Sequence, residues 1–304
     1  MNGGAMRVVT SLLFIVLATA PGRAAPGPSE PPAAEAAGMA ATPAASAPAG
    51  AFGGEAVRIP SRDTTLTAAL FRPDGAGPFP AVVALHGCGG LAKESLDPRY
   101  RDWAKALNDR GFVVLFPDSF GSRGLGSQCR VRARSVTPER ERTADADAAR
   151  RWLQAQSYVR ADRISLLGWS NGGSSVLWAV RPQSRTERSS PDFRSAVAFY
   201  PGCARLVPRA WSARVPTLVL IGGADDWTPA AACEQMVAGA RGRSALTAIE
   251  VYPGAYHDFD APDRPVRLHT GLTFSADGSG RAHSGTNPAA RADAFQRAPA
   301  WLAR

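Results

Sequence analysis

The segment Gly168-Trp-Ser-Asn-Gly172 places a serine between two glycines, where one apolar run ends and another begins. This pattern is typical of a nucleophile elbow, a strand–turn–helix whose turn is too tight for side chains two residues before and after the serine. Ser170 would then lie at a helix amino terminus, where free N–H groups favour a developing negative charge. Chance could produce these letters in a chain with 30 glycines, but the apolar runs 164–167 and 176–180 support the elbow. We therefore predict Ser170 as a nucleophile.

Of the four histidines in the chain, His257 occupies the position expected of the base that removes a serine proton. It follows the strand-like run 248–252 and comes last in the order nucleophile, acid, base, which is typical of folds with such an elbow. His86 instead precedes a glycine-rich turn, and His269 and His283 lie in a polar segment with no predicted strand before them. A lone histidine is more often structural than catalytic, but the position after a strand favours His257.

The acid that orients the base is expected between the serine and the histidine. The strand-like run 217–221 ends in a turn that contains Asp225 and Asp226. We predict Asp225, because the acid usually comes first after the strand-end turn, and keep Asp226 as the alternative. Solvated loop charges are the simpler interpretation of Asp226, Asp258 and Asp260.

Acyl transfer creates an oxyanion, which needs two N–H donors. The amide of Asn171, directly after the serine, is expected to be one of them. The other is expected in the turn 86–90, His-Gly-Cys-Gly-Gly, and Cys88 is preferred because glycines let the backbone approach a substrate. The alternative is an ordinary glycine-rich strand exit.

Strand-like and helix-like runs alternate along the chain. Strands are predicted at 55–60, 65–72, 81–85, 112–116, 164–167, 195–200, 217–221 and 248–252, and helices at 102–110, 137–156, 176–180, 230–241 and 287–302. The first two strands are expected to form a hairpin, and the helix at 137 is expected to begin with Thr137-Pro138. The alternation predicts an α/β fold, with a mostly parallel central sheet flanked by helices on both faces and with ligands beyond the carboxyl ends of the strands.

The first fifty residues differ in composition from the rest. Residues 1–24 predict a secretory signal peptide, because Arg7 precedes a short apolar run and Gly22 and Ala24 have the spacing that signal peptidase prefers. That run is shorter than the ~20 residues a transmembrane helix needs. Residues 25–50, almost entirely Ala, Pro, Gly and Ser, predict a flexible linker. Residues 51–304 are then one α/β domain, and the protein is expected to be periplasmic or secreted.

The chain is basic, with 35 Lys and Arg against 26 Asp and Glu and a net charge of +9. Only Lys93 and Lys105 are lysines, and the arginines are scattered without interleaved aromatic residues, so no nucleic-acid partner is expected. Weak attraction to anionic substrates is compatible with this charge.

Four motifs together resemble the dienelactone hydrolase family of the α/β-hydrolase superfamily, over about residues 55–304. They are Leu-His-Gly-Cys-Gly-Gly at 85–90, Gly-Trp-Ser-Asn-Gly-Gly at 168–173, Gly-Ala-Asp-Asp-Trp-Thr-Pro at 223–229 and Tyr-Pro-Gly-Ala-Tyr-His-Asp-Phe-Asp at 252–260. The resemblance implies the α/β-hydrolase fold and gives Ser170, Asp225 and His257 the positions of nucleophile, acid and base. The founding members carry Cys at the elbow and act on dienelactones in the cytoplasm. Because this chain has Ser170 and a predicted signal peptide, their substrate is not carried over.

These expectations combine into an exported serine hydrolase that cleaves carboxylic esters or lactones of small molecules through an acyl-enzyme. No cofactor, metal or stable membrane insertion after signal cleavage is expected. An exported depolymerase of polyesters or acylated polysaccharides would share the same three residues, and a catalytically silent binding module is the alternative from another class. An intact Ser, Asp and His set argues against the silent module. The sequence leaves open the natural substrate, the oligomeric state and the role of residues 270–288.

Four cysteines in a chain expected to be exported predict disulfides, for which three pairings are possible. In the α/β-hydrolase layout the strand ending near residue 85 neighbours the one ending near residue 116, so the loops that carry Cys88 and Cys129 are expected to be close. The same layout brings Cys203 near Cys233. We predict these two pairs. A zinc site is the weaker interpretation, because no C-x-x-C pair is present.

Overall fold

The computed structural model describes residues 53–91, 98–182 and 191–304, together with Met1. The predicted signal peptide (1–24, apart from Met1) and linker (25–50) lie outside the described residues. Within the described ranges, no helix has both the length and the apolar composition needed to cross a membrane.

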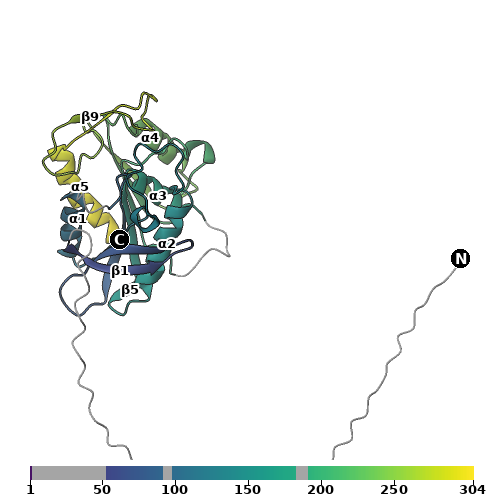
Figure 1. Cartoon of the computed structure of the whole chain (residues 1–304), viewed down its shortest axis with the longest axis vertical. Helices are drawn as coiled ribbons and strands as arrows, with labels where there is room; N and C mark the ends of the chain where they lie inside the picture. Colours follow the sequence, from purple (N-terminus) through teal and green to yellow (C-terminus); the bar gives the residue numbers. More distant parts are fainter. Residues whose placement is uncertain (2–52, 92–97, 183–190) are drawn as a thin grey trace, which may run out of the picture. The chain divides into compact units, whose positions relative to one another are not determined.

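Eight strands form one sheet in the order β1-β2-β4-β3-β5-β6-β7-β8 (Figure 1). The hairpin strands pair antiparallel with each other and β2 pairs antiparallel with β4, whereas all other neighbours are parallel. The mostly parallel sheet confirms the predicted fold class. The strands are β1 (Glu55–Pro60), β2 (Thr65–Phe71), β3 (Phe79–Leu85), β4 (Val113–Pro117), β5 (Val159–Trp169), β6 (Ala196–Phe199), β7 (Thr217–Gly222) and β8 (Thr247–Tyr252).

Helices cover both faces of the sheet (Figure 1). On one face α1 (Pro98–Asn108) contacts α5 (Pro288–Leu302), and the rings of Trp103 and Phe295 stack with centroids 3.9 Å apart. On the other face α2 (Glu141–Gln154) packs against α3 (Asn171–Ala179), while α4 (Ala230–Gly239) packs along β7 and β8. This two-sided cover explains why the central strands are runs of apolar residues with no polar alternation.

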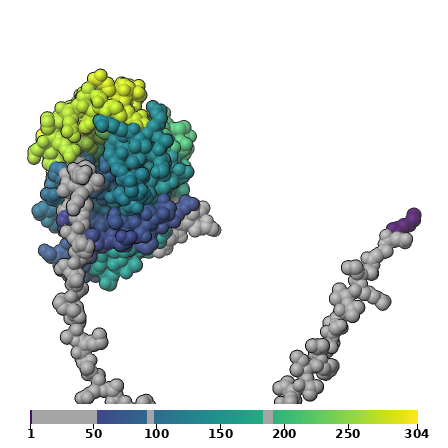
Figure 2. Space-filling view, in the orientation of Figure 1, coloured from purple at the N-terminus to yellow at the C-terminus, as the bar shows by residue number. Residues whose placement is uncertain are grey.

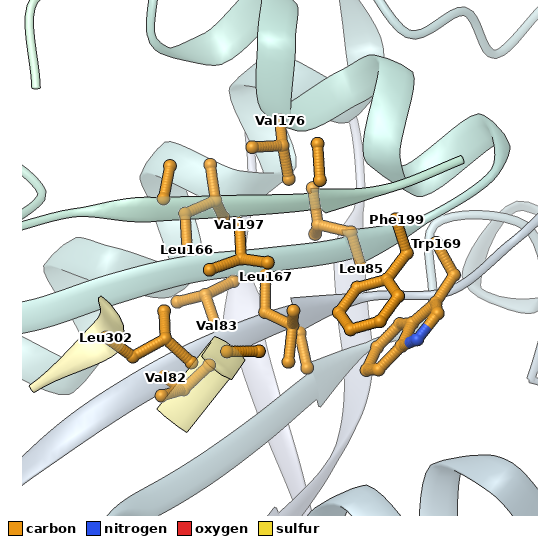
Figure 3. Close-up of a cluster of buried hydrophobic side chains, with 14 of the residues drawn as sticks. Val82, Val83, Leu85, Leu166, Leu167, Trp169, Val176, Val197, Phe199 and Leu302 are labelled. Atoms are coloured by element: carbon orange, nitrogen blue, oxygen red, sulfur yellow. The ribbon is translucent and has the colours of Figure 1, made fainter. Parts of the chain in front are cut away.

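The core lies on and around the central strands. Val82 and Val83 of β3 and Leu166 and Leu167 of β5 are all fully buried (Figure 3). Trp169, the last residue of β5, is also fully buried, and its ring stacks on that of Phe116 with centroids 6.2 Å apart. Close packing of this kind resists deformation, so the carboxyl ends of these strands form a rigid platform for the loops that follow them.

The start of α2 differs from the prediction. The helix begins at Glu141 rather than at Thr137-Pro138, which belong to a preceding turn. Both the N–H and the hydroxyl of Thr137 donate hydrogen bonds to Oε2 of Glu141, at 2.8 and 2.9 Å. The Thr137 side chain therefore binds a carboxylate and does not cap the helix, which starts one turn later.

The polar segment after β8 contains a second, two-stranded sheet that the sequence did not predict. Strands β9 (Arg267–His269) and β10 (Ala282–Ser284) pair antiparallel. The sequence predicted no strand leading into the segment of His269 and His283, whereas the structure places His269 at the end of β9 and His283 in β10. The segment between β8 and α5 gathers at one end of the domain, where it is yellow-green in Figure 2.

The turn between β5 and α3 brings two backbones unusually close together. A Cβ atom built on Gly172 would lie 2.0 Å from the carbonyl oxygen of Leu85, and one built on Gly168 would lie 2.5 Å from that of Gly172. Ser170 between them has φ 53°, a left-handed backbone conformation that is uncommon for a residue with a side chain. The turn therefore excludes side chains at both glycine positions.

We expect Gly172→Ala to lower the free energy of unfolding by about 1–3 kcal/mol, because the added methyl group overpacks the contact with β3. Urea denaturation monitored by circular dichroism measures this change. Gly239→Ala is the matched control, because Gly239 ends α4 with open space around it and alanine favours helix. If Gly172→Ala unfolds at the same urea concentration as the wild type, the close contact between α3 and β3 is incorrect.

Candidate active site

Ser170, His257 and Asp225 are joined by two hydrogen bonds at the carboxyl edge of the sheet. The Ser170 Oγ lies 2.9 Å from Nε2 of His257, and Nδ1 of His257 lies 2.8 Å from Oδ2 of Asp225. Ser170 follows β5, Asp225 follows β7 and His257 follows β8, so the parallel strands bring together residues up to 87 positions apart. His257 and Asp225 are buried, whereas Ser170 borders a pocket.

The two neighbouring aspartates have different partners. Oδ1 of Asp225 accepts hydrogen bonds from the N–H groups of Trp227 and Thr228, at 2.9 and 2.8 Å, which fixes the carboxylate toward His257. Asp226 instead binds His283, accepting from its N–H and contacting its Nδ1, both at 2.7 Å. Asp226 is therefore no free loop charge, and it does not contact His257.

The surroundings of His257 act on its pKa in opposite directions. Burial disfavours the imidazolium, but the charge and hydrogen bond of Asp225 favour it more strongly, so the pKa of His257 is raised above its ordinary value. The ring is held further by Trp227 and Tyr200, with centroids 4.7 and 4.5 Å away. The His257 ring is thus fixed in place and also able to hold a proton.

Two backbone N–H groups beside Ser170 have no acceptor among the described residues. They belong to Cys88 and Asn171, whereas the N–H of Gly87, in the same loop, donates to Oη of Tyr100 at 2.8 Å. The carbonyl oxygen of Cys88 accepts from the N–H of Gln128 at 2.7 Å, which holds the next peptide group, between Cys88 and Gly89, in place. Unpaired N–H groups at a helix start and in a glycine-rich turn suit an anionic oxygen.

Two disulfides lie in the loops around this edge of the sheet. The structure pairs Cys88 with Cys129 and Cys203 with Cys233. The first bond joins the loop after β3 to the loop before α2, and the second joins the loop after β6 to α4. Each bond therefore fastens at least one loop that lacks regular secondary structure. Among the described residues no group of three His, Cys, Asp or Glu could hold a metal ion.

The pocket beside Ser170 has a volume of about 410 Å³ and a strongly basic lining. Its lining includes Trp227, Tyr100 and Leu272 as well as four arginines, namely Arg99, Arg130, Arg264 and Arg267, against the single carboxylate of Asp258. A pocket of this size suits a small molecule. The excess of arginines favours a ligand with negative charge.

Asp258, which is half-buried, and Asp260, which is fully buried, belong to one network and are not the solvated loop charges expected from the sequence. The Arg99 guanidinium binds Asp258 at 2.5 Å and the Tyr200 hydroxyl at 2.6 Å. Burial raises the pKa of the Asp258 carboxyl, but Arg99 outweighs it and holds that pKa well below its usual range. Asp260 accepts hydrogen bonds from Tyr200 and from the indoles of Trp103 and Trp169, at 2.7, 2.8 and 2.9 Å, and burial raises its pKa.

Three buried residues around the site, Tyr200, Arg99 and Arg142, were missed by sequence reasoning. Tyr200 directly follows β6, at the same edge as the candidate residues, so its position after a strand could have identified it. Arg99 and Arg142 lie in helices whose many charges look like solvated faces, and no local pattern marks them as buried. Their burial depends on which helix face contacts the loops.

Comparison with known proteins gives the family. The family model of the "Dienelactone hydrolase family" matches residues 66–304. A Methylorubrum extorquens protein named "Putative carboxymethylenebutenolidase" is 26% identical over 231 residues, which cover 71% of this chain and 75% of that protein. A Bradyrhizobium protein named "Probable 2-oxo-3-(5-oxofuran-2-ylidene)propanoate lactonase" is 27% identical over 218 residues, which cover 67% of this chain and 82% of that protein.

A solved structure of similar fold is that of a "Putative Dienelactone Hydrolase" from Klebsiella pneumoniae. Its TM-score is 0.63 at 23% sequence identity, over 82% of this chain and 97% of that one. This likeness shows the α/β-hydrolase fold. The family model spans the sheet from β2 onward and includes every candidate loop. The chain therefore belongs to the dienelactone hydrolase family of the α/β-hydrolase superfamily.

Proposed function

We propose that the protein is an exported serine hydrolase that cleaves small carboxylic esters or lactones through an acyl-enzyme. The observation that carries this proposal is the hydrogen-bonded series Ser170, His257, Asp225 beside two unpaired N–H groups in a pocket. Each group has the geometry that one step of acyl transfer requires. The names of the relatives, a carboxymethylenebutenolidase and a lactonase, support the same reaction class.

In the first half-reaction, Ser170 Oγ attacks the carbonyl carbon while His257 takes the hydroxyl proton at Nε2. The negative charge that forms on the carbonyl oxygen is stabilised by the N–H groups of Cys88 and Asn171. The imidazolium is stabilised by Asp225 and returns its proton to the leaving oxygen as the C–O bond breaks. In the second half-reaction a water molecule gives a proton to His257 and attacks the acyl carbon. His257 then returns that proton to Ser170 Oγ as the acyl C–O bond breaks, which releases the acid and restores Ser170. For a lactone, the leaving oxygen stays attached to the acyl group.

The pocket favours a small, negatively charged substrate. Its four arginines and limited volume suit a carboxylated ester or lactone. A polyester depolymerase would instead be expected to have an open groove lined by aromatic residues. The word "carboxymethylene" in the relatives' name describes such a substrate. Export is supported by the two disulfides, which persist in oxidising compartments, and by the predicted signal peptide.

Ser170→Ala is expected to abolish ester hydrolysis, with a loss of ~10⁴-fold or more in kcat, while the circular dichroism spectrum is unchanged. A fluorophosphonate probe should label the wild type but not this variant. His257→Ala should lose as much activity as Ser170→Ala. In Asp226→Asn kcat should stay within about threefold of the wild type, because Asp226 is hydrogen-bonded to His283 and not to His257. Substantial hydrolysis by Ser170→Ala would refute the assignment.

The pH profile follows from the pKa of His257. The base must be neutral to accept a proton, and its pKa is raised, so kcat/KM should increase with pH and reach half its maximum above about pH 6.5. In Asp225→Asn the charge that raises this pKa is removed while burial remains. In the residual activity of this variant, kcat/KM should therefore reach half its maximum at a lower pH than in the wild type; this rise of kcat/KM with pH is the acid limb of the profile. Asp226→Asn should not shift the acid limb. An unshifted limb in Asp225→Asn would contradict the role of Asp225.

The exposed arginines of the pocket give a test of substrate charge. Arg130→Gln and Arg267→Gln should each lower kcat/KM for an ester with a carboxylated acyl group by about two- to fivefold, the range of an exposed ion pair. The same variants should leave a neutral ester of similar size unaffected. Arg241→Gln, exposed beyond α4 and away from the pocket, is the matched control. Equal losses for both esters would exclude recognition of negative charge.

A further inference from the structure

The guanidinium of Arg142, in α2, binds both segments that carry the unpaired N–H groups beside Ser170. The side chain is fully buried. Its Nη1 donates to Oδ1 of Asn171 at 2.6 Å, and its Nη2 donates to the carbonyl oxygen of His86 at 2.7 Å. One side chain thus holds Asn171 itself and the peptide two residues before Cys88.

A buried arginine is usually neutralised by a carboxylate in direct contact, because an isolated charge is costly to bury. No carboxylate among the described residues is hydrogen-bonded to Arg142, and Asp145, one turn along α2, binds Arg123 instead. The Nε of Arg142 has no hydrogen-bond partner among the described residues either. The carboxylates of Asp145 and Asp118 stabilise the charge through space and without a hydrogen bond, and the ring of Phe120 lies with its centroid 5.1 Å from the guanidinium carbon.

The charge nevertheless persists at neutral pH. Burial lowers the pKa of Arg142 to about 10, which still leaves the group protonated. Its neighbour His86 responds to it: burial and the Arg142 charge hold the pKa of His86 well below its ordinary value. A neutral His86 can accept the hydrogen bond from the N–H of Ser119 at 3.1 Å, which fixes the start of the loop. The arrangement therefore combines a buried positive charge that is hydrogen-bonded only to neutral acceptors with a fixed loop.

We propose that Arg142 is a positioning residue of the oxyanion hole: it aligns the Cys88 and Asn171 amides and its charge favours the negative charge that forms between them. This inference rests on the proposed acyl transfer. Because the oxyanion exists only in the transition state and intermediate, the effect belongs to kcat and not to substrate binding. Arg142 itself touches no substrate, since Asn171 and His86 lie in between.

The test compares Arg142→Met and Arg142→Lys with a matched variant of the same helix. Arg150 is 2% exposed on α2 and binds Asp147 and the carbonyl oxygen of Pro191, with no contact to the active site. Arg142→Met is expected to lower kcat by about 10- to 100-fold with KM within about threefold, and Arg142→Lys should recover part of the loss. Arg150→Met should keep wild-type kcat even if it loses as much melting temperature.

A trifluoromethyl ketone gives a readout that a merely structural role would not change. Its adduct with a serine carries an oxyanion, so its inhibition constant should rise in Arg142→Met in proportion to the fall in kcat/KM. The unreactive methyl ketone of the same shape should bind Arg142→Met and the wild type equally. If Arg142→Met does not fold, Arg142→Lys and Asn171→Leu carry the same comparison.

The outcomes separate this inference from the proposed function. Wild-type kcat and ketone inhibition in a folded Arg142 variant, with Ser170→Ala inactive, would overturn the role of Arg142 alone. Substantial activity in Ser170→Ala would overturn the acyl-enzyme itself. A loss of kcat in Arg150→Met equal to that in Arg142→Met would show that α2 acts only through stability.

Discussion

The close contact between the start of α3 and the end of β3 is the constraint on which the site depends. Gly172 lies so near the carbonyl oxygens of Leu85 and His86 that no side chain fits between them, and Ser170 is held at φ 53°. The same contact places the loop after β3 beside the serine, because a Cβ on Gly87 would be 3.8 Å from Cβ of Ser170. Backbone strain at such a turn persists only where a packed core enforces it. The buried strands β3 and β5 provide that core.

Around this turn, the protein buries charged groups in fixed pairs and networks. Tyr200 and Asp258 have positive φ angles, like Ser170, and Arg99 binds the side chains of both. Buried and mutually hydrogen-bonded groups cannot reorient when the charge of a reacting molecule changes, so their dipoles and charges are already aligned before reaction. We regard the network of Arg99, Tyr200, Asp258 and Asp260 as the support that keeps the loop of His257 in place.

The loops that border the pocket are fastened by bonds from distant parts of the chain. The segment with β9 and β10 contacts His257. The N–H of Gly285 donates to the carbonyl oxygen of His257 at 3.0 Å, and Ser284 forms a β-bridge with His257. The Cys88–Cys129 bond fastens the loop that follows β3, and the carbonyl oxygen of Cys129 accepts from the N–H of Thr273 at 3.2 Å. The segment after β8 is therefore part of the support of the site as well as part of its wall, since Arg267, His269 and Leu272 line the pocket.

The sequence by itself determined the strands of the main sheet, most of the helices and their order along the chain, because buried parallel strands must be apolar runs and a tight elbow must have glycines at 168 and 172. It did not indicate β9 and β10. It also pointed to Ser170, Asp225 and His257, since residues that follow parallel strands meet at one sheet edge. Only the tertiary structure decided which charges are buried. Arg142 looks like part of a solvated helix, and Asp258 and Asp260 look like loop charges, because local sequence does not specify which face of a helix or loop packs against the core. The tertiary structure also showed that Asp225 is hydrogen-bonded to His257, whereas Asp226 is hydrogen-bonded to His283. Sequence could not separate these neighbouring aspartates, because they differ only in the direction that the folded turn gives their side chains.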